Sequence, residues 1–339
     1  MTRMKQLLLA TALVAISAPA LANGLLTTAN TRIGINDDGS IDASTIAGTI
    51  GIGYNSPSFG GFRDALTPGC LCEAWGVSAN GISGYVGQSN GNSGIGVNAS
   101  SAGTSNNAMA AAATATFTSN TVLTAVPGLS ITQTFSLAAS TATGDLFMDK
   151  VVISNTSGAK LTDVRFGRAM DWDVPPTEFS EFVTHKGTAT TANLLRSTDD
   201  GFANADPIND MTNTGIVGGN VNTDFTDLGP SDHGSLFIFG FGDLEDGKSI
   251  EFNIFYGAGA NESDALALLA QVSPELYSLG QSNLSGTAAN AQPTFVFAFN
   301  GVGGSVVVPP DRDVPEPATL ALFGMGLLGL GIARRRMKK

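Results

Sequence analysis

Apolar and polar residues alternate along much of the middle of this 339-residue chain. Leu129, Ile131 and Leu137 fall on one face of a segment that follows the turn at Pro127-Gly128. This turn predicts a hairpin with residues 122–126, because proline followed by glycine suits a type II turn. A period of two is that of a β-strand with one buried face. By the same criterion we expect further strands at 147–153, 161–174, 236–241, 250–256 and 295–299.

Aromatic or other large apolar residues at every second position mark three of these strands. Two strands have phenylalanine throughout, at Phe237, Phe239 and Phe241 and at Phe295, Phe297 and Phe299, and in the third the alternating residues are Ile250, Phe252, Ile254 and Tyr256. Aromatic stripes of this kind build sheet cores. The alternative is a platform that stacks on sugars, for which tryptophan and tyrosine are better suited than phenylalanine.

One segment has helical spacing instead. Asn261 can cap a helix whose apolar residues lie between Ala265 and Val272, and Ser273-Pro274 ends it. We expect this helix to plug an end of the sheets. The Gly-, Ser- and Asn-rich segments 77–107 and 201–222 are predicted loops, although loops this long are uncommon unless they are functional or contain short strands. The predicted fold is therefore an all-β, antiparallel β-sandwich with one short helix.

Residues 1–22 have the pattern of a secretory signal peptide. A basic start at Arg3 and Lys5 precedes an apolar run, and Ala20 and Ala22 supply the small residues of a cleavage site. We expect the Sec export machinery to recognise this leader and cleavage to follow Ala22. The alternative, a short core helix, would have to bury the charged leader and a proline.

An uncharged apolar stretch covers residues 318–333. As a helix it would be about 24 Å long, slightly short of the ~30 Å hydrocarbon core of a membrane. Arg334, Arg335 and Arg336 follow it and would hold that end in the cytoplasm. We therefore expect a short transmembrane helix.

Pro315, Glu316 and Pro317 stand directly before this stretch. The order of this tripeptide, the apolar helix and the arginine cluster resembles the PEP-CTERM sorting signal of Gram-negative bacteria, and the resemblance covers residues 314–339. It implies recognition by exosortase, a membrane-embedded cysteine protease-like transpeptidase that cuts near the motif. It also implies an intermediate in the inner membrane and then release to the cell surface, the extracellular matrix or exopolysaccharide. Such tails also occur on ice-binding proteins, and an ordinary membrane anchor is the alternative.

The two ends leave a β-rich body at 23–304 and a linker at 305–313. The whole chain has 29 acidic and 17 basic residues and a net charge of -12. The body is more acidic in composition than the whole chain, because leader and tail concentrate basic residues. Its charge would repel phosphates, so we expect no nucleic-acid partner.

Two aspartates offer candidate chemistry. Alternation places Arg165, Asp171 and Asp173 on one face of a predicted strand. Two such carboxylates can ligate a hard cation such as calcium, with Glu178 or Glu181 completing the shell. The two aspartates fit a role as acid and base in glycoside hydrolysis less well. The two carboxylates of a glycosidase lie on opposite sides of the scissile bond, across a cleft, and not next to each other on one strand. The pattern most favours a solvated sheet face on which Arg165 pairs with an aspartate.

Cys70 and Cys72 are the two cysteines of the chain. An exported protein meets oxidising conditions, which favours a disulfide between them over two reduced thiols. A zinc site would need further soft ligands, and the chain has only His185 and His233, which we expect in loops.

Other motifs are weak. Residues 36–42 resemble the start of a calcium loop but lack its closing glutamate, so we expect a turn between strands. No nucleophile elbow, dinucleotide fingerprint or phosphate loop is present, so we predict no catalytic residue and no cofactor beyond the calcium alternative. We expect a non-enzymatic structural or adhesive surface protein. The alternatives are a secreted carbohydrate-active enzyme and, from threonine triplets at 114–118, 141–143 and 188–190, an ice-binding protein.

Overall fold

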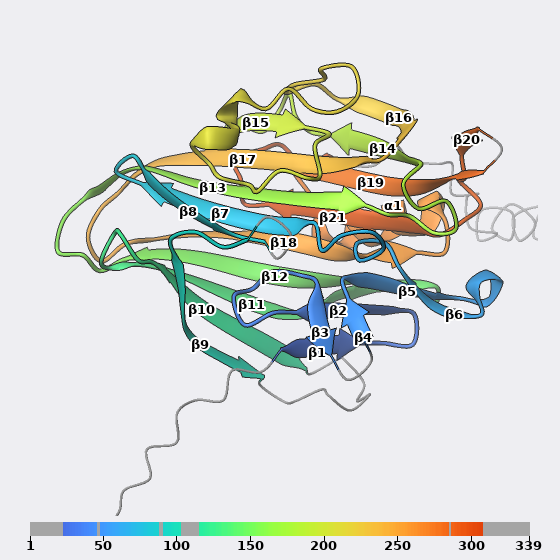
Figure 1. Ribbon diagram of the computed structural model, residues 1–339, viewed down its shortest axis with the longest axis horizontal. Coiled ribbons are helices and arrows are strands. Elements are labelled where there is room, and N and C mark those ends of the chain that lie inside the picture. Colours follow the sequence, from blue (N-terminus) through green and yellow to red (C-terminus); the bar gives the residue numbers. More distant parts are fainter. Residues whose placement is uncertain (1–22, 46–47, 88–90, 103–114, 285, 308–339) are drawn as a thin grey trace, which may run out of the picture.

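The computed structural model describes residues 23–45, 48–87, 91–102, 115–284 and 286–307, which fold mainly into antiparallel β-strands (Figure 1). The largest sheet has ten strands. Their order is β16 (Phe225–Ser231), β14 (Glu181–Lys186), β19 (Leu276–Leu284), β21 (Thr294–Asn300), β18 (Ser249–Gly259), β12 (Gly144–Asn155), β11 (Leu129–Ser140), β10 (Thr116–Leu123) and β9 (Ile95–Ala102), with β20 (Thr287–Ala288) paired to β19.

Two smaller sheets and a hairpin complete the described fold. The five-stranded sheet contains β15 (Leu194–Thr198), β17 (His233–Leu244), β13 (Leu161–Trp172), β7 (Glu73–Ala79) and β8 (Ile82–Val86). The four-stranded sheet contains β1 (Gly24–Thr27), β2 (Thr31–Ile35), β5 (Ile52–Ser56) and β6 (Gly61–Asp64), and β3 (Ala43–Thr45) pairs with β4 (Gly48–Ile50). Short 3-10 helices lie at η1 (Pro57–Phe59) and η3 (Asn209–Thr212). The predicted all-β class with antiparallel sheets is confirmed.

The phenylalanine stripes form the core between the sheets. Phe237 and Phe239 of β17 are fully buried against Phe299 of β21, with ring centroids 5.6 Å and 4.9 Å apart. One apolar cluster joins residues of all three sheets. These stripes are therefore core, and the interpretation as a sugar-stacking platform is wrong for them.

The predicted helix is present as α1 (Glu262–Val272). The side chain of Asn261 accepts a hydrogen bond from the Asp264 backbone N–H at 3.0 Å, and Ser273 ends the helix with a positive φ of 49°. Its buried residues, Leu268 among them, pack on Leu146 and Val296 in a cluster separate from the main core. The helix thus covers the outer face of the ten-stranded sheet, and the expectation that it plugs an end is wrong.

The segment at 77–107 differs from the predicted loop. It contains the last three residues of β7, all of β8 and all of β9. Segment 201–222 has only η3 as regular structure, as a loop would. Glycine, serine and alanine interrupt the apolar alternation of these strands, as Gly84 does in β8.

The predicted signal peptide at 1–22 and sorting tail at 314–339 lie outside the described residues. Of the predicted linker, residues 305–307 are described, and Val307 donates a backbone hydrogen bond to Pro274 at 2.8 Å. Among the helices of the described residues, none combines the length and apolar character that crossing a membrane requires.

Candidate functional site

Three carboxylates meet at the end of β13. Asp171 lies on β13, Asp173 directly follows it, and Asp232 lies between β16 and β17. The pairing of Trp172 with His233 brings these two strand ends together. One oxygen from each of the three aspartates lies within 4.8 Å of the others. The structure therefore brings the two aspartates singled out in the sequence together with a third.

Asp171 and Asp173 lie away from solvent, Asp232 is partly buried, and several oxygens of the three carboxylates lack hydrogen-bond donors. Asp171 is 1% exposed and Asp173 is 0% exposed. Oδ1 of Asp171, both carboxylate oxygens of Asp173 and Oδ1 of Asp232 are buried without a hydrogen-bond partner. Gly201 helps to cover Asp171, because a Cβ on Gly201 would lie 2.4 Å from the Asp171 Cα. Buried polar groups normally have partners, so this arrangement requires an explanation.

The two glutamates named as further ligands are otherwise engaged. Glu178 forms an ion pair with Arg63, with Oε1 and Nη2 2.7 Å apart. Glu181 is fully buried and accepts backbone hydrogen bonds from Ser180 at 2.9 Å and from His233 at 3.1 Å. The third carboxylate of the cluster is Asp232, which the sequence did not reveal. Only the register of β13 with β17 could have indicated it.

Burial changes the protonation of this region. Desolvation, reinforced by the neighbouring carboxylates, raises the pKa of Asp171 and Asp173 to about 8. The pKa of Glu181 rises to about 9, again through burial first, although the His233 backbone N–H opposes the rise. Without a bound cation these carboxyls therefore retain protons near neutral pH.

The favoured prediction of a solvated sheet face is wrong for Asp171 and Asp173, because both are buried. Arg165 does pair with an aspartate, but its partner is Asp163, at 2.7 Å. In the described part of the chain, no basic side chain forms an ion pair with Asp171, Asp173 or Asp232. His233 interacts electrostatically with Asp232 and opposes the rise that burial causes in the pKa of Asp232, so the charge of the cluster is compensated only in part.

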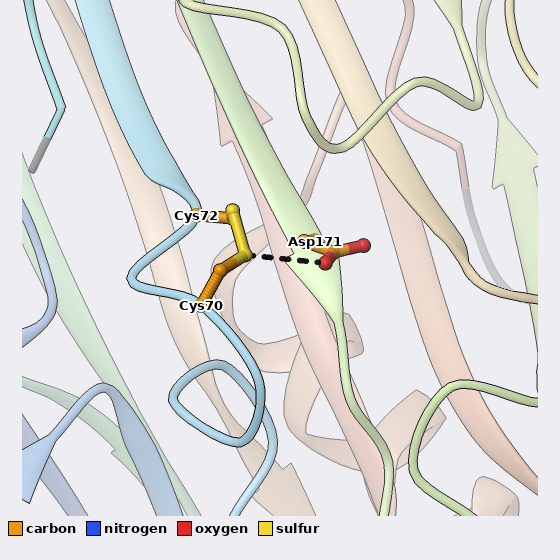
Figure 2. Close-up of side chains that lie close together, drawn as sticks. All are labelled: Cys70, Cys72 and Asp171. Atoms are coloured by element: carbon orange, nitrogen blue, oxygen red, sulfur yellow. Dashed lines mark hydrogen bonds between the residues drawn. A yellow bond between two sulfur atoms is a disulfide. The ribbon is translucent and has the colours of Figure 1, made fainter. Parts of the chain in front are cut away.

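A disulfide lies beside this cluster. Cys70 and Cys72 are joined, with their Cα atoms 5.3 Å apart. Figure 2 shows Cys70 Sγ facing Asp171, and the dashed line spans 3.8 Å to Oδ2. A disulfide sulfur carries no hydrogen, so this contact provides no donor to the carboxylate. Oxidation also removes the thiolates that zinc would need from the Cys70, Cys72 and Asp171 group.

The backbone ties the disulfide segment to β13. The Asp171 N–H donates to the Cys72 carbonyl at 3.0 Å, and the Asp173 N–H donates to the Ala65 carbonyl at 2.9 Å. The carboxylates thus lie where a strand end, a strand-connecting turn and a disulfide-bearing loop meet.

A second charged cluster lies inside the sandwich. Arg168 of β13 is fully buried and forms ion pairs with Glu73 and, at 3.5 Å, with Asp149. It also donates to Gln133 at 2.7 Å and to the Gly39 carbonyl at 3.0 Å. The alternation along the strand could have indicated that Arg168 is buried, because Arg168 lies on the same face of β13 as buried Phe166 and Met170. The three nitrogens of the guanidinium each donate to a protein oxygen, so we interpret this cluster as structural.

Both histidines lie in strands, and the expectation that they occupy loops is wrong. His185 of β14 and His233 of β17 are each 0% exposed. His185 Nε2 lies 2.8 Å from Ser235 Oγ, and His233 Nδ1 lies 2.9 Å from Asp199 Oδ2. Burial lowers the pKa of His185 to about 3, so its imidazole is neutral.

The acidic segment at 36–42 forms a turn between β2 and β3. The Gly39 N–H donates to the Asn36 carbonyl at 2.9 Å, and Asp38 accepts from the Ser40 N–H at 3.0 Å. Asp42 is buried and accepts a hydrogen bond from Asn36. The side chains of this turn thus stabilise the turn itself.

One comparison with known proteins identifies a motif. The profile of the PEP-CTERM protein-sorting motif matches residues 313–336. No curated protein and no solved structure matches the chain. The match covers the C-terminal end and not the β-sandwich. It indicates a PEP-CTERM protein that exosortase processes at the membrane before export to the surface.

Proposed function

We propose that this chain is a non-enzymatic surface protein of a Gram-negative bacterium whose β-sandwich associates with exopolysaccharide. The observation that carries the proposal is the sorting motif at residues 313–336. A signal peptide would deliver the chain to the Sec machinery, and the tail would hold it in the inner membrane until exosortase acts. The body would then act outside the cell.

The arrangement of acid–base groups supports a non-enzymatic role. His185 and His233 are fully buried and bonded to Ser235 and Asp199. The clustered aspartates lie side by side, with Asp171 and Asp173 buried, whereas a glycosidase needs two carboxyls on opposite sides of a bound sugar. This placement supports a role other than glycoside hydrolysis.

A hydroxyl-rich sheet face supports contact with a polar polymer. In the pairing of β10 with β11, half-buried Thr116 lies opposite Ser136, Thr118 lies opposite Thr134, and Asn120 lies opposite Thr132. Thr118 Oγ1 and Thr134 Oγ1 are 3.4 Å apart. Such hydroxyls both donate and accept hydrogen bonds, as sugar hydroxyls do.

The threonine triplets give less support to an ice-binding protein. Residues 116–118 lie on β10, residues 141–143 form the turn between β11 and β12, and residues 188–190 follow β14. The three segments belong to different parts of the fold, so they do not combine into one flat threonine face.

Sorting is tested by fractionating cells that express tagged protein, with intact-mass measurement of each fraction. The wild-type chain should lose residues 1–22 and a C-terminal piece near Pro315. A chain in which Pro315, Glu316 and Pro317 are replaced by alanine should remain in the membrane fraction with its tail uncut. Equal surface delivery of both chains would contradict the proposal.

Association and catalysis are tested separately. The mature protein should co-sediment with exopolysaccharide from the producing strain and remain soluble when that polymer is absent. Incubation with the polymer should leave its chain length unchanged in size-exclusion chromatography. Shortening of the polymer would overturn the non-enzymatic role, and failure to co-sediment would overturn the association.

A further inference from the structure

We propose that Asp171, Asp173 and Asp232 bind one calcium ion that fastens the end of β13 to the turn between β16 and β17. This site goes beyond the proposed function and does not depend on how the protein is exported. It rests on the positions of three carboxylates and on the absence of other partners for their oxygens.

The spacing of the oxygens suits one ion. Calcium binds oxygens at about 2.3–2.6 Å, so two oxygens on the same ion lie at most roughly 5 Å apart. One oxygen from each of Asp171, Asp173 and Asp232 lies within 4.8 Å of the other two. A calcium ion can therefore contact all three without a large movement of the backbone.

The buried oxygens provide a second, independent indication of a ligand. Asp173 is 0% exposed, and neither of its carboxylate oxygens has a hydrogen-bond partner. Oδ1 of Asp171 and Oδ1 of Asp232 are also buried and unpartnered. A structural carboxylate normally accepts donors, as Asp64 does from the Leu66 and Gly51 backbones at 2.9 Å. The oxygens of the cluster face one another instead.

The surrounding charges favour a cation. Asp64, Glu178, Glu181 and Asp200 all interact electrostatically with at least one member of the cluster, and all are acidic. The nearest arginine pair, that of Arg63, is directed to Glu178. His233 directs Nδ1 to Asp199. A divalent cation would supply the positive charge that these described side chains do not provide.

The donor set selects calcium among common ions. All three ligands are carboxylates, and calcium takes six to eight oxygens in flexible geometry, with water completing the shell. Magnesium requires a tighter octahedron at about 2.0–2.1 Å. Zinc prefers nitrogen and sulfur, but the nearby Cys70 and Cys72 are in a disulfide.

Bound calcium would connect three separate segments. Asp171 and Asp173 hold the loop at 65–72 through their backbone N–H groups, and Figure 2 shows the disulfide of that loop facing Asp171. Asp232 belongs to the turn that enters β17. The ion would therefore act as a structural cross-link at one end of the five-stranded sheet.

The test uses the purified mature protein, calcium chloride and the chelator EGTA. Calorimetric titration should show one calcium ion per chain. At a calcium concentration of ~100 times Kd, the thermal midpoint should lie roughly 5 °C or more above the midpoint in EGTA. Equal midpoints in calcium and EGTA, or equal stabilisation by calcium and magnesium, would overturn the assignment.

Two variants localise the effect. Asp173→Asn and Asp232→Asn should each lower calcium affinity at least tenfold, and circular dichroism in EGTA should show that both remain folded. The matched control is Asp163→Asn, which removes a 54%-exposed carboxylate from the same strand and should bind calcium like the wild-type protein. If one cluster variant does not fold, the other decides. Wild-type affinity in a folded cluster variant would place the ion elsewhere and contradict the proposal.

Discussion

Arg168 carries a positive charge between two sheets, where no water can solvate it. Its ion pairs with Glu73 and Asp149 compensate that charge. Its guanidinium carbon also lies over the ring of Tyr256, 5.4 Å from the ring centroid. Its bond to the Gly39 carbonyl also joins β13 to the turn after β2. One side chain thus links three parts of the sandwich.

Replacing Arg168 with methionine should therefore destabilise the protein by about 3–5 kcal/mol, because it leaves buried Glu73 and Asp149 without a counter-charge. Arg165→Met is the control on the same strand, and its half-exposed pair with Asp163 should contribute less than about 1 kcal/mol. Urea unfolding measures both. Similar losses for the two variants would show that the buried network does not hold the sheets together.

His185 makes stability sensitive to acid. Burial lowers its pKa to about 3, whereas an unfolded histidine titrates near 6.5. Between these values the unfolded chain binds a proton that the folded chain does not, so stability falls as the pH falls. In His185→Gln, the loss of unfolding free energy from pH 6.5 to pH 5 should be smaller by about 1.5 kcal/mol. Denaturant titrations at both pH values test this, and parallel pH dependences would contradict it.

The site residues could be predicted only in part. Asp171 and Asp173 stood out because they are two apart beside a strand. Asp232 did not, because its proximity depends on which strands pair and in what register. Burial of Asp171 depends on Gly201, which is 30 positions away and lies over it only in the folded chain. Local patterns contain neither fact.

Among the elements, α1 shows how local signals and packing agree. Asn261 caps its start, and Leu268 is fully buried in the cluster that the helix forms with the ten-stranded sheet. Leu268→Ala should cost about 2–5 kcal/mol, since it opens a cavity. Exposed Gln271→Ala should change stability by less than about 0.5 kcal/mol. A thermal unfolding series measures both, and a small loss for Leu268→Ala would mean that the helix adds little to the body.

Strands with an uninterrupted apolar alternation could be predicted, and strands in which small or polar residues interrupt it could not. β17 and β21 carry phenylalanine at every second position, and β18 alternates apolar and aromatic residues from Ile250 to Tyr256. β9 has Ile95, which packs on the core, and Val97, but its other residues are small or polar, and it pairs with β10 along its length. Its sequence therefore contains too short an apolar pattern to predict a strand. The position of α1 was missed because its pattern shows an apolar face but not which surface that face covers.

At the scale of the whole molecule, the described body ends before the sorting tail begins. Glu275 accepts backbone hydrogen bonds from Val302 and Gly304, each at 2.8 Å, and Val307 donates to Pro274. These contacts fix the chain to the body after β21. Cleavage within the tail should therefore leave the sandwich intact.

Deleting residues 315–339 should leave the thermal midpoint of the purified protein within about 2 °C of the full chain. Glu275→Ala is the contrasting change, because it removes the acceptor of two backbone N–H groups at a cost of about 1–3 kcal/mol. Differential scanning calorimetry in the same detergent buffer compares all three. A large drop on tail deletion would mean that the tail is part of the folded body.

The position of β21 bears on mechanics. This strand lies between β18 and β19 and is hydrogen-bonded to both, and the chain after it stays in contact with the body as far as Val307. If the protein is held by its C-terminus, a pulling force on that end reaches the sandwich through the segment that follows β21. Force along β21 would shear two ladders at once instead of peeling bonds one at a time. In a chain held by its C-terminus, the two ladders of β21 would therefore resist unfolding of the sandwich under a pulling force.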